Sequence, residues 1–266
     1  MQDKGLQHLS QLIKDYCGLR YGDRLNTLKE RTSDRITTLG LSYWEYCRYL
    51  QTTPAEWDSL VELLTINETY FYREENQLNE CCSVILPTIK KRINRPIRIW
   101  SAACSSGEEP YTLAMLIHET GLFLPGAVEI IATDIDIKVL EKAKKGWYHQ
   151  GSFSFRRIPA HLLKKYFSEA DGGYQISPSI KRMVKFQQLN LLDEEMVASI
   201  SEVDVIFCRN VLIYFDQEVT NTVISSMNRN LVSGGYLFLG HADAITDSRL
   251  GLNKVYSDKT FYYRKD

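Results

Sequence analysis

Apolar residues recur at helical intervals in the first quarter of the chain, and no strand-like alternation is found there. This spacing predicts a region built from helices, with Pro54 between the last two because proline is disfavoured inside a helix. The predicted helices span residues 3–16, 24–39, 42–51 and 56–66. We therefore expect an all-α N-terminal domain over residues 1–66.

From Pro96 onward, short apolar runs alternate with helical segments, which is typical of an α/β domain with helices on both faces of its sheet. The predicted strands are Ile97–Ala102, Glu129–Thr133, Val184–Gln188, Val203–Cys208, Tyr236–Gly240 and Thr260–Tyr263. The predicted helices are 75–92, Pro110–Thr120, Ile137–Lys145 and Gln217–Leu231. Too few residues separate the last two strands for a crossover helix, so we expect them to run antiparallel in a mixed sheet.

Residues 147–182 interrupt this alternation. They contain several aromatic residues, Pro159, Pro178 and a pair of glycines at 172–173. Paired glycines between short apolar runs favour a tight turn. We expect a small inserted subdomain that contains a β-hairpin.

The composition argues against several classes of protein. The chain has 266 residues, 44% of them hydrophobic, and a formal net charge of −1, which argues against a dedicated nucleic-acid binder. The N-terminus lacks the apolar core of a secretory signal, and no run approaches the ~20 apolar residues of a membrane span. The six cysteines are scattered without metal-ligand spacing. We therefore expect a cytoplasmic protein with reduced thiols, no bound metal and no membrane insertion.

Polar residues follow each of the first four predicted strands. They lie in the segments 102–108, 134–136, 189–191 and 209–211. In an open α/β sheet the ligand binds beyond the carboxyl ends of the strands, so we expect these segments to share one crevice. Taken singly, Asn190 and Asn210 would also suit ordinary turns.

The loop after the first strand carries a single glycine, Gly107, followed by Glu108 and Glu109. A phosphate-binding turn needs several glycines, and two carboxylates would repel a pyrophosphate by several kcal/mol if poorly screened. Asp134 ends the second strand, where an acid commonly binds ribose hydroxyls; capping the helix that begins near Asp136 is the alternative role. A cationic nucleoside without phosphate, such as S-adenosylmethionine, fits this pattern, and NAD is disfavoured.

Four segments resemble the chemotaxis-receptor glutamate O-methyltransferases, the CheR family. They are NETYFYRE (67–74), WSAACSSGEEPY (100–111), ATDID (132–136) and FCRNVLIYFD (207–216), in the order and near the spacing of the family. The similarity covers nearly the whole chain. It implies a class I methyltransferase fold, which is Rossmann-like, with S-adenosylmethionine as methyl donor and S-adenosylhomocysteine as product. The implied reaction gives glutamyl methyl esters on the cytoplasmic coiled coil of a chemoreceptor.

The resemblance also implies how the chain is divided into domains. Residues 67–95 would form a linker and a helix closing on the cofactor cleft, and residues 96–266 the methyltransferase domain. The cofactor contacts implied by the family are Asn67, Thr69, Arg73, Gly107, Glu108, Asp134, Asn190, Leu191, Arg209 and Asn210.

Two features depart from the family pattern. The segment 240–243 reads Gly-His-Ala-Asp, where the family often has Gly-His-Ser-Glu. The turn at 168–174 is shorter than in members that dock on a pentapeptide tether at the receptor C-terminus. We therefore expect the protein to recognise receptors without that tether. We also expect it to be a monomer.

The implied reaction needs few catalytic groups. A glutamate carboxylate, with an ordinary pKa of about 4.3, is already ionised at neutral pH and needs no general base. Catalysis would come from orientation and from excluding water. Arg73 and Tyr214 are the candidate catalytic residues that would align the substrate. The alternatives are a cofactor role for Arg73 and ordinary packing for Tyr214.

Three arginines suggest where the partner binds. Arg24, Arg31 and Arg35 fall on one side of the predicted helix 24–39, beside its apolar stripe. Such a ridge could steer an acidic coiled coil. The alternative is a solvated face with local pairs to Glu30 and Asp34.

Other functions remain open on the residues alone. One is methylation of a small molecule or of RNA, although Cys208-Arg209-Asn210-Val211 stands where adenine-N6 enzymes carry a Pro-Pro-aromatic turn. Another is a non-catalytic module that binds S-adenosylmethionine or acts as a scaffold.

Overall fold

The computed structural model describes residues 4–243, 245 and 250–266. The predicted start of the first helix at residue 3 lies outside the described residues. Of the described helices, none is long and apolar enough to cross a membrane.

The N-terminal part of the chain is helical, as the apolar spacing predicts. Its helices are α1 (Lys4–Cys17), α2 (Leu25–Thr38), α3 (Tyr43–Thr52) and α4 (Pro54–Leu64). Helix α3 begins with a capping box between Ser42 and Glu45, and α4 begins at Pro54, whose missing N–H costs nothing in a first turn. The apolar faces of the four helices bury Leu9, Ile13 and Leu28 in a core of their own.

The rest of the chain is built on a mixed sheet. Its described strands are β1 (Ile97–Ala102), β2 (Val128–Asp134), β6 (Val184–Gln188), β7 (Val203–Cys208), β8 (Leu231–Leu239), β9 (Leu252–Tyr256) and β10 (Phe261–Lys265). Their order is β6-β2-β1-β7-β8-β10-β9. The first five are parallel, and β10 runs antiparallel to β8, as predicted. The strand order reverses beside β1, so this edge is the switch point where a ligand is expected.

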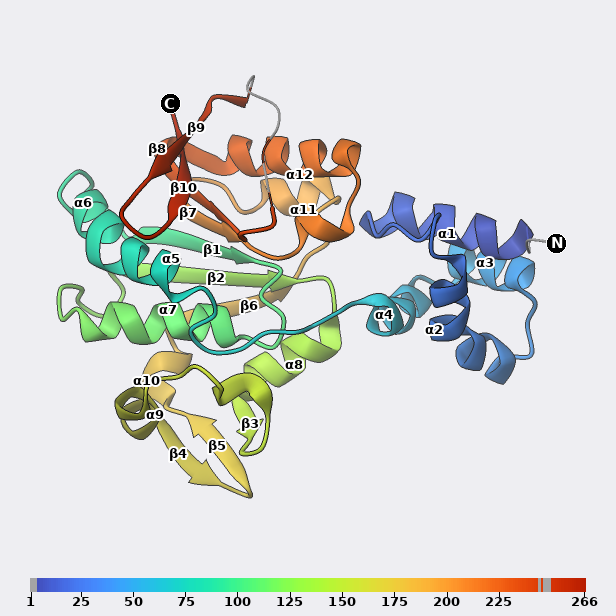
Figure 1. Cartoon of the computed structure of the whole chain (residues 1–266), viewed down its shortest axis with the longest axis horizontal. Coiled ribbons are helices and arrows are strands. Elements are labelled where there is room, and N and C mark those ends of the chain that lie inside the picture. Colours follow the sequence, from blue (N-terminus) through green and yellow to red (C-terminus); the bar gives the residue numbers. More distant parts are fainter. Residues whose placement is uncertain (1–3, 244, 246–249) are drawn as a thin grey trace.

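Helices cover both faces of the sheet (Figure 1). One face packs against α5 (Glu75–Glu80), a π-helical turn at Cys81–Ile85, α6 (Leu86–Lys90), α7 (Glu108–Glu119) and α8 (Ile137–Lys145). The other packs against α11 (Glu194–Ala198) and α12 (Gln217–Asn230). Neighbouring residues of a strand point to opposite faces of the sheet. Ile99 therefore packs in the core beneath α5–α8, and Trp100 in the core beneath α11 and α12.

The inserted subdomain follows α8. It contains β3 (Trp147–His149), a 3₁₀ turn at Phe153–Phe155, α9 (Ala160–Tyr166), β4 (Phe167–Ala170), β5 (Gly173–Ile176) and α10 (Pro178–Lys181). Strands β4 and β5 form the predicted hairpin, and β3 pairs with β5 on its other side.

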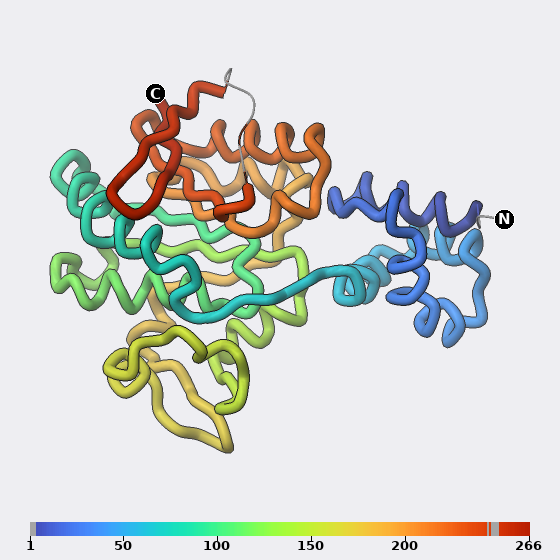
Figure 2. The backbone as a smooth tube through the Cα atoms, in the orientation of Figure 1, coloured from blue at the N-terminus to red at the C-terminus, as the bar shows by residue number. Residues whose placement is uncertain are grey.

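A connecting segment, residues 65–74, joins the helical part to the sheet; residues 65–70 have no regular structure and 71–74 form turns (Figure 2). It leaves α4, passes the carboxyl ends of the strands and reaches α5, with the inserted subdomain beside it. Any pocket at the switch point is therefore bordered by this segment as well as by the sheet.

Candidate active site

A pocket lies between the N-terminal helices and the carboxyl ends of the strands. It brings together most of the predicted site residues, namely Arg24, Arg31, Asn67, Thr69, Arg73, Asp134, Asn190, Leu191, Arg209, Asn210 and Tyr214. Of the described site residues, Gly107, Glu108 and Arg35 do not line it. The strand ends therefore converge on one crevice, as the sheet topology requires.

Asp134 lies at the floor of this pocket, at the end of β2. Its carboxylate is 7% exposed and accepts hydrogen bonds from the backbone N–H groups of Ser105 (2.7 Å) and Asp136 (3.0 Å). Burial raises the pKa of Asp134 to about 6, because a charged group is poorly solvated there. Asp136, and not Asp134, caps α8 by accepting from Lys138 N at 2.9 Å. The helix-capping role that was the alternative for Asp134 therefore belongs to Asp136.

Gly107 serves the packing of the loop after β1. Its φ of 94° is left-handed, and a Cβ there would lie 2.9 Å from the Cβ of Ala143 on α8. The loop thus needs glycine for close helix packing and for its backbone conformation. It does not need glycine to admit a phosphate.

Glu108 and Glu109 point in different directions. Glu108 is 1% exposed and accepts from the hydroxyls of Ser106 and Ser154, each at 2.8 Å, and its burial raises its pKa. Glu109 lines the pocket and accepts from Ser101 Oγ at 2.7 Å. The acid that faces the ligand space is therefore Glu109, where Glu108 was expected.

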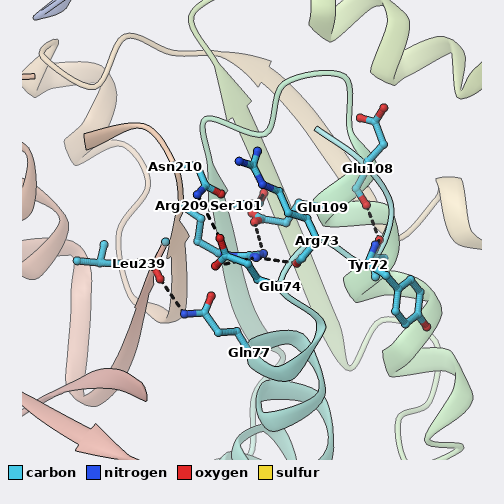
Figure 3. A network of polar contacts seen from close by, with 12 residues as sticks. Tyr72, Arg73, Glu74, Gln77, Ser101, Glu108, Glu109, Arg209, Asn210 and Leu239 are labelled. Atoms are coloured by element: carbon cyan, nitrogen blue, oxygen red, sulfur yellow. Dashed lines mark hydrogen bonds and ion pairs between the residues drawn. The ribbon is translucent and has the colours of Figure 1, made fainter. Parts of the chain in front are cut away.

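Arg209 binds the pocket-lining acid to the linker (Figure 3). This buried guanidinium donates to Glu109 at 2.8 Å and to the backbone carbonyl of Arg73 at 2.6 Å, and lies 3.2 Å from Glu74. Asn210 also donates to Glu74, at 3.1 Å. Arg209 is thus shared between two carboxylates, of which Glu109 lines the pocket and Glu74 does not.

Asp243 fixes the loop that follows β7. Its buried carboxylate accepts from the backbone N–H groups of Asn210 (2.8 Å), Gly240 (3.0 Å) and Ile213 (3.2 Å). Burial raises its pKa. In this chain an aspartate at the Gly-His-Ala-Asp corner thus has a defined structural task, which the sequence alone did not reveal.

The two candidate catalytic residues face the same pocket. Arg73 donates to the backbone carbonyl of Glu68 at 2.7 Å, and its guanidinium carbon lies 5.8 Å from the ring centre of Tyr70. The backbone carbonyl of Tyr214 accepts from Arg20 N at 3.3 Å, which places the tyrosine beside the α1–α2 turn. Both side chains border the ligand space.

Asn67 ties the linker to the end of β2, and Asn190 ties the sheet to the helical part. Asn67 donates to Asp136 at 2.7 Å, and Asn190 donates to the carbonyl of Tyr16 at 2.5 Å. Asn190 Oδ1 also accepts from Leu192 N, as a turn asparagine does. Asn190 therefore has the turn role considered from sequence and also lines the pocket.

The three ridge arginines have different environments. Arg35 binds Glu56 through two bonds of 2.9 and 2.6 Å, and Glu56 is only 3% exposed. Arg31 donates to the carbonyl of Leu64 at 2.7 Å at the end of α4. Arg24 donates to the carbonyl of Arg20 at 2.7 Å and borders the pocket. The ridge is therefore partly used in holding the helical domain together.

The chain matches two protein-family models over most of its length. The model for the CheR methyltransferase SAM-binding domain matches residues 67–261, and that for the CheR methyltransferase all-alpha domain matches residues 4–65.

Curated relatives agree with this match. Chemotaxis protein methyltransferase 2 of Vibrio cholerae is 40% identical over 226 residues, covering 84% of this chain and 77% of that protein. Chemotaxis protein methyltransferase of Borreliella burgdorferi is 35% identical over 255 residues, covering 92% and 89%. The probable biofilm formation methyltransferase WspC of Pseudomonas aeruginosa is 34% identical over 260 residues, covering 96% and 60%. With both of its parts matched, the chain belongs to the CheR methyltransferase family.

Proposed function

We propose that this protein methylates glutamate side chains on the cytoplasmic coiled coil of chemoreceptors, with S-adenosylmethionine as donor. The products are glutamyl methyl esters and S-adenosylhomocysteine, and the reaction serves sensory adaptation. The observation that carries the proposal is a single pocket at the switch point into which Asp134, Glu109 and Arg73 all face.

The residues of the pocket fit this cofactor. Asp134 has a buried carboxylate that can accept hydrogen bonds from two ribose hydroxyls. Glu109 is a pocket-lining carboxylate whose partner Arg209 is shared with Glu74, and it suits the ammonium group of the methionine part. Asn190 and Leu191 border the side where the adenine would lie, and Asn67, Thr69, Arg209 and Asn210 complete the wall. When bound, the cofactor supplies an electrophilic methyl group on a sulfonium.

The chain's own residues then need only to orient the acceptor. A substrate carboxylate is ionised at neutral pH, so a cation and a hydrogen-bond donor suffice to align it. Arg73 supplies the cation, and Arg209 holds its backbone through the Arg73 carbonyl. Tyr214, which also lines the pocket, supplies a hydroxyl donor. The helical domain over the pocket excludes water from the reacting carboxylate.

We propose that the acidic substrate helix approaches past Arg24 and Arg31, with Arg35 acting through Glu56 inside the helical domain. Recognition would not require a pentapeptide tether, because only Asp171 and Gly172 separate β4 from β5. The protein would act as a cytoplasmic monomer. Its units would be residues 1–66, 67–95 and 96–266, with the insert at 147–182.

The test is transfer of labelled methyl groups to purified receptor cytoplasmic fragments. We expect alkali-labile label on glutamate, and none when the modified glutamates are replaced by glutamine. Alkali-stable label would point to methylation of nitrogen instead. Heat from S-adenosylhomocysteine binding without any turnover would favour a non-catalytic module.

A further inference from the structure

The inserted subdomain encloses one side chain of the linker. Phe71 is fully buried, and its ring centre lies 5.0 Å from that of Tyr148, 5.5 Å from Phe155 and 5.2 Å from Phe167. These three rings belong to the insert, and they form a cage around Phe71. Aromatic contacts of this kind add to the free energy gained by burial alone. Residues on both sides of Phe71 in the linker line the pocket.

Ser154 of the insert reaches two pocket-lining segments at once. Its backbone carbonyl accepts from Phe71 N at 2.9 Å, and its hydroxyl donates to Glu108 Oε1 at 2.8 Å. Glu108 begins α7, and the next residue, Glu109, faces the ligand space. A buried serine thus connects the linker with the start of α7.

Arg156 makes a further contact at the surface. Its guanidinium carbon lies 3.8 Å from the ring centre of Tyr70, and it donates to Glu68 at 2.8 Å. Glu68 also lines the pocket. Successive linker residues are therefore held by neighbouring residues of the insert.

The linker needs such support. Tyr72 and Glu74 have φ values of 67° and 52°, a backbone conformation that is costly for residues other than glycine. Strained backbone persists only where its surroundings fix it. Arg209 holds the segment from the sheet side, through Arg73 O and Glu74, and the insert holds it from the other side.

We propose that the inserted subdomain positions the cofactor pocket, with Ser154 as a positioning residue that acts through Glu108 and through the backbone at Phe71. The insert is then part of the machinery that shapes the ligand space. The binding part of this inference concerns S-adenosylhomocysteine alone; its effect on turnover rests on the proposed function.

Calorimetry with S-adenosylhomocysteine tests the proposal on the full chain. Removing a hydrogen bond to a buried charged group should weaken ligand binding by about tenfold in Ser154→Ala. Phe71→Leu should weaken it to a similar degree. Ser179→Ala and Trp147→Leu are matched controls, because both lie in the insert, where Ser179 bonds to Ser177, and Trp147 donates to the Ala170 carbonyl and lies against Lys145 of α8. We expect both controls to bind as the wild type does.

A double variant tests whether Ser154 acts through Glu108. If Ser154 acts through Glu108, the losses in Ser154→Ala and Glu108→Gln should not add in the combined variant. Thermal melts distinguish an effect of Ser154 on the shape of the pocket from an effect on the stability of the fold. A lowered melting temperature in Ser154→Ala with unchanged ligand affinity and unchanged KM for the cofactor would overturn the inference.

Measuring methyl transfer distinguishes the proposed function from the proposed positioning role of the insert. If the wild type binds S-adenosylhomocysteine but methylates no receptor fragment, the proposed function fails, and the affinities of the variants still decide the positioning role. If receptors are methylated and Ser154→Ala matches the wild type in affinity and rate, only the positioning role is lost.

Discussion

Asp134 should make cofactor binding depend on pH near neutrality. Its pKa is raised to about 6 by burial, whereas ribose hydroxyls donating to the carboxylate favour the ionised form. Protonation therefore favours the ligand-free protein, and ligand affinity is full above pH 6 and falls as the pH drops below it. The loss should approach tenfold per pH unit. Calorimetry with S-adenosylhomocysteine between pH 5 and 8 measures this directly.

Asp134→Asn provides the control for that profile. The amide cannot ionise, so affinity should be about 10- to 100-fold lower at pH 8 and flat across the same range. An unchanged pH profile in the variant would assign the titration to another group.

Glu109 should recognise the ammonium end of the cofactor. In Glu109→Gln we expect S-adenosylhomocysteine to bind at least about tenfold more weakly, because a charge-assisted hydrogen bond is lost. Methylthioadenosine, which lacks the ammonium, should bind the variant and the wild type alike. Equal weakening of both ligands, seen by calorimetry, would show that the substitution damages the pocket as a whole.

At this scale the sequence predicts most of the residues that line the pocket, but not the orientation of every side chain. Asp134 is predictable because an acid after the second strand has one main use in this fold. The sequence does not predict which of Glu108 and Glu109 faces the pocket. Adjacent helical residues point about 100° apart, and the rotation of α7 about its axis decides which side chain enters the pocket. The pairing of Arg35 with Glu56 is equally hidden, since the partner lies on another helix.

Among the elements, the parallel strands β1, β6 and β7 have the limits that the sequence predicts. Strands β1 and β7 lie inside the sheet and are short, largely apolar runs, whereas β6 lies at one edge and begins with an apolar–polar alternation. Strand β9 was not predicted. It lies at the sheet edge and none of its residues is buried, and its apolar residues Leu252, Val255 and Tyr256 do not alternate with polar ones as in a half-buried strand. The interruption of the helix at 75–90 by a π-helical turn also leaves no recognisable mark in the sequence.

The loop between β1 and α7 should tolerate no side chain at Gly107. Gly107→Ala incurs the left-handed backbone cost and a contact of 2.9 Å with Ala143, so we expect a loss of about 2–4 kcal/mol in the free energy of unfolding. Gly121→Ala is the matched control, with a φ of 63° and nothing within 4 Å of the added Cβ. It should cost only about 1 kcal/mol. Denaturant unfolding compares the two, and equal losses would contradict the packing argument.

Across the whole molecule, the pocket depends on contacts between the helical domain and the sheet. Gln188 donates to Asp58 at 2.7 Å, Asn190 to Tyr16 at 2.5 Å, and Lys14 pairs with Asp216 at 2.7 Å. Of these residues Asn190 lines the pocket, and each part has its own apolar core, with Ile135 of the sheet domain packed against that of the helical domain. Polar contacts between separate cores are weak alone, so a ligand bound by both parts should strengthen their association.

Ligand binding should therefore protect both parts of the chain together. At a concentration 100 times its Kd, S-adenosylhomocysteine should add about 2.7 kcal/mol to the free energy of unfolding. Because Arg24 and Val61 border the pocket from the helical domain, hydrogen exchange should slow in α2 and α4 as well as in β2 and α8. Asp134→Asn, with its roughly 10- to 100-fold lower affinity, should gain only about 0.4–1.4 kcal/mol at the same ligand concentration, with correspondingly weaker protection in both parts. Slower exchange confined to the sheet would mean that the helical domain contributes no binding energy, and its place over the pocket would then serve the substrate alone.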